Sequence, residues 1–219
     1  MDQSVSSSKR HTKTIFIVAT VLLGGFLSVA CCIGLVVVAA IGQDEPLSDA
    51  ERELLIDPQE LGTSLGYDLQ ANPAQVKYTK NKSLGITTIT LEYESPDDAA
   101  VPFYLNHELT YEPTVQDARD TFNIGKVVLN QGVELFVGPG AEYVDANDLY
   151  TCCDESASQI FTIRDEASGE MVEVGHLFIM RSGSITMTLL YVGPVSHDPQ
   201  QWRDLLDPHF DAIIHARPH

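Results

Sequence analysis

The sequence predicts an α+β fold in which a single N-terminal transmembrane helix is followed by an antiparallel sheet with helices packed on it. Three observations support this prediction. Residues 15–41 carry no charged side chain over 27 positions. Several segments between residues 76 and 192 alternate apolar and polar residues, as half-buried strands do. After residue 198, apolar residues recur at helical spacing, which is typical of a helix with one buried face.

The uncharged run is long enough to cross a membrane, because a helix needs about 20 apolar residues to span the bilayer core and satisfies its backbone polar groups internally. We expect residues 15–42 to be a retained, single-pass anchor in the cell membrane and residues 1–14 to be a short cytoplasmic tail. Basic side chains tend to remain in the cytoplasm, and three of them precede the run: Lys9, Arg10 and Lys13. The rest of the chain is therefore expected outside.

Two cleaved forms of this segment are alternatives. The apolar core of a signal peptide has about 7–15 residues, far fewer than this run, although residues 40–42 resemble a cleavage site. A bacterial lipoprotein would be processed at Cys31, but ten mostly apolar residues follow Cys32, where a lipoprotein would turn polar. The uninterrupted length of the run favours the retained anchor.

A stripe of small residues follows one face of the predicted anchor. Gly24, Ser28 and Cys32 lie four positions apart, and such stripes allow a second transmembrane helix to approach closely. The stripe predicts a transmembrane protein partner bound through the anchor. The alternative is that the stripe binds nothing, because small residues are common in single-pass anchors.

Charge is distributed unevenly along the chain. The whole chain has a net charge of −18, yet the tail before the anchor carries three basic groups against Asp2. The remaining 30 acidic and 10 basic residues give the part beyond the anchor a charge of −20. Such a surface repels phosphate backbones and anionic lipid headgroups, which argues against nucleic acid as a ligand. It suits cations or a basic protein surface, and it also keeps an exposed domain soluble.

The chain beyond the anchor is expected to begin with a linker at residues 43–75, which contains short helices, and to continue as a folded domain at residues 76–219. Within the linker, Ser48 and Glu51 have the spacing of a capping box. Asp57 precedes a proline and suits the cap of a further helical turn.

The first half of the domain is predicted to contain three strands, at residues 76–80, 85–94 and 101–111, with a turn at 81–83 between the first two. That turn carries a glycosylation sequon at Asn81, which matters only in a eukaryotic secretory pathway. One face of the second strand is expected to be buried: Thr87, Ile89, Leu91 and Tyr93.

A helix is predicted after Thr114, because this residue suits a cap and apolar residues follow at helical spacing. Its apolar face consists of Val115, Ala118, Phe122 and Leu129. Gly125 weakens the second half of the helix. Two strands at residues 126–129 and 133–137 are therefore the alternative there, although we prefer the helix.

The last third of the chain is predicted to form three strands at residues 159–164, 171–181 and 184–192, followed by a closing helix. On the middle strand, four residues are expected to share one face: Val172, Val174, Phe178 and Met180. The closing helix begins after Asp198, and Pro208 is expected to kink or restart it.

The closing unit, SITMTLLYVG followed by DPQQWRDLLDPHFDAII, resembles the final strand and helix of the PsbP-like α+β fold. The resemblance covers about 35 residues and rests on pattern rather than on a diagnostic motif. It implies an extracytoplasmic accessory subunit of a membrane complex, since that family includes such proteins among other roles. Fold analogy of this kind is only associational.

Catalytic signatures are absent from the sequence. It contains no G-x-S-x-G element, P-loop or dinucleotide fingerprint. His107 and Glu108 begin an H-E-x-x-H metal motif, but Tyr111 occupies the position of the second histidine. His176 lies among apolar residues of its strand and is expected to be a hydrogen-bonded core histidine. We therefore predict no enzyme activity and no cofactor.

The most unusual segment is an acidic loop, residues 145–155, that contains two adjacent cysteines. Its oxygen-bearing side chains are candidates for a calcium-type site: Asp145, Asn147, Asp148, Asp154 and Glu155. Their spacing differs from that of an EF-hand, and the glycine which that motif requires is missing. A solvated acidic loop is the simpler interpretation.

Cys152 and Cys153 are the only cysteines beyond the anchor. Adjacent Cα atoms lie about 3.8 Å apart, whereas ordinary disulfides span about 4.4–6.8 Å. A vicinal disulfide between them would be a strained ring that is more reducible than a structural bridge. Free thiols, intermolecular bonding and metal capture remain open alternatives.

Taken together, these features predict a membrane-anchored, extracytoplasmic accessory or binding protein that serves as a non-catalytic subunit of a membrane complex. A cation- or ligand-binding module built on the acidic loop is the second hypothesis. A hydrolase with a scattered acidic site is the third, and no motif supports it.

Overall fold

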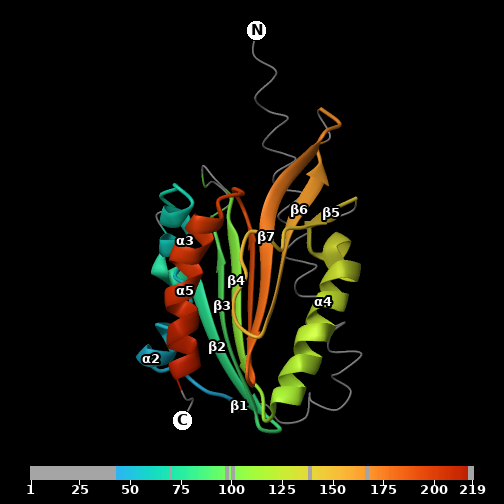
Figure 1. The fold of residues 1–219 in the computed structure, drawn as a ribbon. Helices are drawn as coiled ribbons and strands as arrows, with labels where there is room; N and C mark the ends of the chain where they lie inside the picture. The colour runs from blue at the N-terminus through green and yellow to red at the C-terminus, as the bar shows by residue number, and fades with distance from the viewer. Residues whose placement is uncertain are drawn as a thin grey trace.

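The structure, a computed structural model, describes residues 43–69, 71–96, 99, 102–137, 140–165 and 168–216. These residues form one antiparallel sheet with helices on both faces, which confirms the predicted α+β class (Figure 1). The predicted anchor at residues 15–42 lies outside the described residues. Among those that are described, no helix is both long and apolar enough to cross a membrane.

The sheet has eight strands in the order β1-β2-β3-β4-β8-β7-β6-β5. Two meanders, β1–β4 and β5–β8, meet where β4 pairs with β8 in antiparallel fashion. The strands have the following bounds: β1 Gln43–Asp44, β2 Val76–Ser83, β3 Ile86–Glu94, β4 Tyr104–Tyr111, β5 Glu142–Asp145, β6 Glu155–Arg164, β7 Met171–Ser182 and β8 Ile185–Val192.

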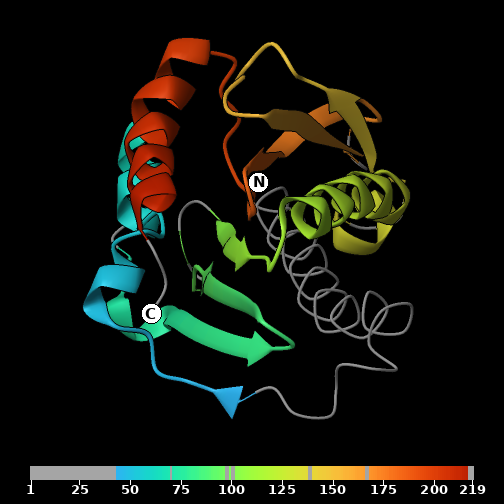
Figure 2. The same cartoon turned by 60° about the horizontal axis from the view of Figure 1, so that its bottom comes forward.

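The helices divide between the two faces of the sheet. Their bounds are α2 Asp49–Arg52, α3 Pro58–Ser64, the short 3₁₀ turn η1 Pro73–Gln75, α4 Val115–Val137 and α5 Pro199–His215. Figures 1 and 2 show α2, α3 and α5 on one side of the sheet and α4 on the other. The side with three helices holds the main core, and the α4 side holds a smaller one.

The main core is organised around Trp202 of α5, which is fully buried. Its ring centroid lies 4.6 Å from that of Phe178 and 4.9 Å from that of His176. The α4 core is smaller, and Phe122 of the helix packs there with Phe161 of β6. Aromatic side chains bury large apolar areas, so these two clusters are the main hydrophobic contribution to folding.

Residues 43–75 differ from the expected linker, because most of them belong to the folded domain. The capping box at Ser48 and the Asp57 cap are both present, as predicted. Five apolar side chains of this segment are buried in the main core: Leu47, Leu54, Leu55, Ile56 and Leu61. They cover the part of the main-core face that is formed by β2, β3 and β4, beside α5.

The turn between β2 and β3 lies at Leu84 and Gly85 rather than at residues 81–83, so the predicted position is wrong. Residues 81–83 continue β2 and pair with β3. Leu84 has φ 53° and Gly85 has φ 83°, and two successive positive φ values are what a two-residue type I′ hairpin requires. The polar composition of residues 81–83 resembles a turn. However, the positive φ values that the hairpin requires occur at Leu84 and Gly85, so the turn lies beyond residues 81–83.

A bulge in β7 moves Val174 away from the face predicted for it. Phe161 of β6 pairs with Gly175 while Thr162 pairs with Glu173, so that Val174 is the extra residue. It therefore packs in the α4 core instead of sharing a face with Phe178. An extra residue reverses the alternation beyond it.

The two long helices agree with their predicted positions. Helix α4 continues through Gly125 to Val137, so the helix rather than the two alternative strands is confirmed. Ala118 and Phe122 face the sheet, whereas Val115 is exposed and does not join the buried face. Helix α5 continues through Pro208 without a restart.

Candidate functional site

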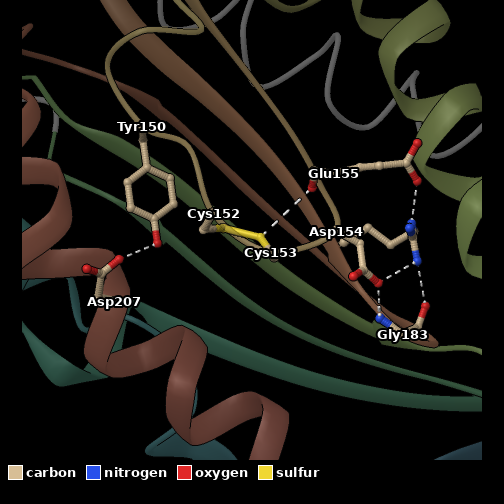
Figure 3. The surroundings of a disulfide bond; sticks show 8 residues. Tyr150, Cys152, Cys153, Asp154, Glu155, Gly183 and Asp207 are labelled. Atoms are coloured by element: carbon tan, nitrogen blue, oxygen red, sulfur yellow. Dashed lines mark hydrogen bonds and ion pairs between the residues drawn. A yellow bond between two sulfur atoms is a disulfide. The ribbon is translucent and has the colours of Figure 1, made fainter.

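The loop between β5 and β6 carries the two adjacent cysteines and runs from the α5 side to the edge of the β7–β8 hairpin. Cys152 and Cys153 are joined by a disulfide (Figure 3). Cys152 packs against the main core, while Cys153 is exposed and has φ 58°, an unusual conformation for a residue other than glycine. The disulfide therefore lies at the surface, on a loop whose two ends are held.

The end that follows the disulfide is held by Arg181 of β7, which is only 2% exposed. Its Nε lies 2.6 Å from Oε2 of Glu155, and its Nη1 lies 3.2 Å from Oδ2 of Asp154. The same Nη1 donates to the carbonyl of Gly183, at 2.9 Å. Figure 3 shows the three residues that accept these bonds: Asp154, Glu155 and Gly183.

The sheet register explains this arrangement. Glu155 begins β6 directly opposite Arg181, so their side chains share one face of the sheet. Asp154 adds a second attachment, because its Oδ2 accepts from the backbone N–H of Gly183 at 2.9 Å. The buried guanidinium thus has two carboxylates and one carbonyl as acceptors, which is how a buried cation is tolerated.

The beginning of the loop is held by polar contacts to strands and to α5. Asn147 Oδ1 accepts from the N–H of Ser158 at 3.0 Å. Tyr150 donates its hydroxyl to Asp207 Oδ1 at 2.8 Å (Figure 3). Burial, together with this neighbouring carboxylate, raises the pKa of Tyr150 above its usual value, so the hydroxyl stays protonated and donating.

The five predicted oxygen ligands are not brought together in one site. Asp145 accepts from the Gln159 side chain at 3.2 Å, Asn147 bonds to backbone, and Asp148 is exposed. Asp154 and Glu155 turn to Arg181 instead. In the part of the chain that the structure describes, no group of three or more acidic, histidine or cysteine side chains is arranged to hold a metal ion.

Two histidines are fully buried in the main-core face. His176 accepts a hydrogen bond at Nε2 from the N–H of Ser196, at 3.2 Å, which confirms it as a hydrogen-bonded core histidine. His107 accepts at Nδ1 from the N–H of Ile56, at 2.8 Å. Burial lowers the pKa of each to about 3. Both are therefore neutral, and the acceptor nitrogen of each is already occupied, which leaves neither one available as a base.

The structural role of His107 was not predicted, because the sequence drew attention to it only as half of a metal motif. A signal for its burial is present, since it alternates with Leu105 and Leu109 on the inward face of β4. The predicted helix-packing residues Gly24, Ser28 and Cys32 lie outside the described residues.

Comparisons with known proteins add one structural likeness. No family model and no curated protein sequence matches the chain. Among solved structures, the extracellular domain of PknH from Mycobacterium tuberculosis is similar, with a TM-score of 0.45 and 10% sequence identity. The match covers 76% of this chain and 98% of that one.

Proposed function

We propose that this chain is a single-pass membrane protein whose acidic α+β domain lies outside the membrane and acts as a non-catalytic accessory or binding subunit of a membrane complex. The observation that carries the proposal is the uncharged run of 27 residues, which ends two residues before the first strand of the domain. A run of that length has the span of a transmembrane helix.

Two features support an extracytoplasmic position for the domain. The basic residues lie on the tail side of the run, which favours a cytoplasmic tail. The Cys152–Cys153 disulfide suits an oxidising compartment, since disulfides are rare in the cytosol.

The geometry of the cysteine loop supports a binding or structural role. Its two carboxylates, Asp154 and Glu155, are engaged by Arg181, and its tyrosine is engaged by Asp207. These groups hold the loop in place rather than converging on a shared point where a substrate or cation would lie. No specific observation favours the cation-binding alternative. The resemblance of the closing unit to the PsbP-like fold is consistent with an accessory subunit.

The test of this proposal is whether the anchor contacts a partner in the membrane. Replacing Gly24 and Ser28 with leucine is expected to reduce co-purification of partner subunits in mild detergent, because bulky side chains prevent close helix approach. Membrane insertion should be unchanged, since the apolar length is the same.

The matched control replaces Ala19 and Ala30 with leucine. These residues are also small, but at about 100° per residue they lie roughly 120–140° around the helix from the stripe. This variant should retain the partners of the parent protein. If the stripe variant brings down the same partners in the same amounts, or if the parent brings down none, the partner proposal is wrong.

A further inference from the structure

The pairing of β1 shows at which end of the sheet the chain enters the domain. Strand β1 pairs antiparallel with the end of β2, so that Gln43 lies opposite Lys82 and Asp44 opposite Asn81. The next step, Glu45 N–H to the Lys80 carbonyl, continues in the same direction. Followed backwards, β1 therefore points towards the β2–β3 turn. Residue 41, the last of the apolar run, is two residues before Gln43, a reach of at most about 7 Å.

The same end of the domain exposes a group of apolar side chains. Leu84, at the tip of the β2–β3 turn, is 74% exposed, and Val115 at the start of α4 is 49% exposed. Pro113, two residues before Val115, is also exposed, and its Cγ would be 3.4 Å from a Cβ added to Gly85. Figures 1 and 2 show the turn and the start of α4 at the end where β1 lies.

Leu84 is an unfavourable choice for the fold itself. Its φ of 53° lies in the left-handed region, where side chains other than those of asparagine and aspartate meet a steric penalty. Type I′ turns accordingly favour Asn-Gly or Gly-Gly. An exposed leucine here gains no burial that would offset the penalty. Such strain is characteristic of positions that serve a contact outside the fold.

We propose that Leu84, Pro113 and Val115 form a bilayer-facing patch, which rests on the outer membrane surface with Leu84 in the headgroup region. This inference rests on the proposed anchor. The chain leaves the bilayer within two residues of β1, so the β1 end of the domain is held against the membrane. Apolar side chains at that depth are stabilised by transfer out of water.

The net charge of the chain beyond the anchor indicates which kind of lipid surface the patch contacts. The part of the chain beyond the anchor carries a charge of −20, which opposes close contact with anionic lipids. The nearby Lys80 and Lys82 are paired with Glu45, at 3.6 and 3.0 Å. A zwitterionic surface such as phosphatidylcholine is therefore the partner that the patch fits.

The test uses the full chain reconstituted into phosphatidylcholine vesicles whose acyl chains carry bromine, a quencher of tryptophan fluorescence. Leu84→Trp and Val115→Trp each add a reporter to the patch. Val144→Trp, on β5 at the opposite end of the sheet, is the matched control, because Val144 is similarly exposed at 57%. The native Trp202 is fully buried, and its signal is subtracted using the parent chain.

We expect about two-fold quenching of the reporters at residues 84 and 115, because an interfacial side chain lies within about 5–10 Å of the acyl boundary, and almost none at residue 144. Leu84→Asn should raise the melting temperature by about 4 °C while the Val115→Trp reporter, placed in that background, loses quenching. A chain that alkaline carbonate extracts from the vesicles would overturn the anchor. A chain that stays embedded while residues 84 and 115 are quenched no more than residue 144 would overturn the patch alone.

Discussion

Acidification from pH 7 to pH 4 is expected to lower the free energy of unfolding by about 3 kcal/mol for each of two buried histidines, His107 and His176. In the folded domain burial lowers the pKa of each to about 3, whereas the usual value is 6.5. Both side chains are fully buried. An imidazole that takes up a proton at either position would lose its hydration without gaining a hydrogen-bond acceptor.

The direction of this change in the free energy of unfolding follows from proton binding. Between pH 6.5 and pH 3 the unfolded chain binds a proton at each histidine and the folded domain does not. Protonation therefore favours the unfolded state, and stability falls as the pH falls through this window, by about 1.4 kcal/mol per pH unit for each histidine. Above pH 6.5 both states are neutral at these positions, and this contribution to the pH dependence disappears.

The measurement is chemical denaturation of the detergent-solubilised chain at a series of pH values, followed by the fluorescence of Trp202. His107→Gln and His176→Gln each retain an acceptor for the backbone N–H that the imidazole now binds, and each should flatten the slope below pH 6.5 by the amount of one histidine. His215→Gln, at an exposed position, is the control for the substitution itself. Equal slopes in all variants would show that the buried histidines do not control acid stability.

Removing the carboxylates that hold Arg181 is expected to destabilise the domain by about 3 kcal/mol. In the Asp154→Asn, Glu155→Gln variant the guanidinium keeps its buried position but loses both countercharges. The reverse change, Arg181→Met, should cost less, about 1–2 kcal/mol, because Asp154 and Glu155 are 52% and 33% exposed and can be hydrated. Because Arg181 is the most buried of the three charged groups, removing its two carboxylate partners should destabilise the domain more than removing the arginine itself.

The control for this asymmetry is Arg119 of α4, whose Nε lies 3.6 Å from Oε2 of Glu155 and whose side chain is half exposed. Arg119→Met should change stability by less than about 1 kcal/mol, as is usual for an exposed ion pair. Denaturant midpoints of the four proteins give the comparison. A larger loss for Arg181→Met than for the double carboxylate variant would mean that packing of the arginine side chain matters more than its charge.

Most strands were predictable from the sequence, because apolar and polar residues alternate in them over long stretches without interruption. In β3, Ile89, Leu91 and Tyr93 all face the main core, as their spacing indicates. The positions of the first turn and of Val174 depend instead on backbone conformation. Leu84 is not a residue that turn preferences would select, and a one-residue bulge leaves no mark in the apolar pattern. Gly175 is the nearest signal in the sequence, because a Cβ there would collide with the carbonyl oxygen of Tyr191.

The candidate site was predictable only in part. The unusual composition of residues 145–155 identified the loop. The structure places the disulfide of this loop at the surface of the domain. However, the partner of Asp154 and Glu155 is Arg181, which follows 26 residues after Glu155. Only the register of β6 on β7 brings these residues together, and no local spacing reports that register. The acidic side chains therefore resembled a cation site until their arginine partner was known.

The proposed topology is tested by the position of the domain relative to the membrane. Protease is added to intact cells that express the chain with one epitope tag before residue 1 and another after residue 219, and permeabilised cells serve as the control. If the domain lies outside the membrane, the C-terminal tag and the domain are lost from intact cells while the N-terminal tag is protected. A protected C-terminal tag together with an accessible N-terminal tag would contradict it.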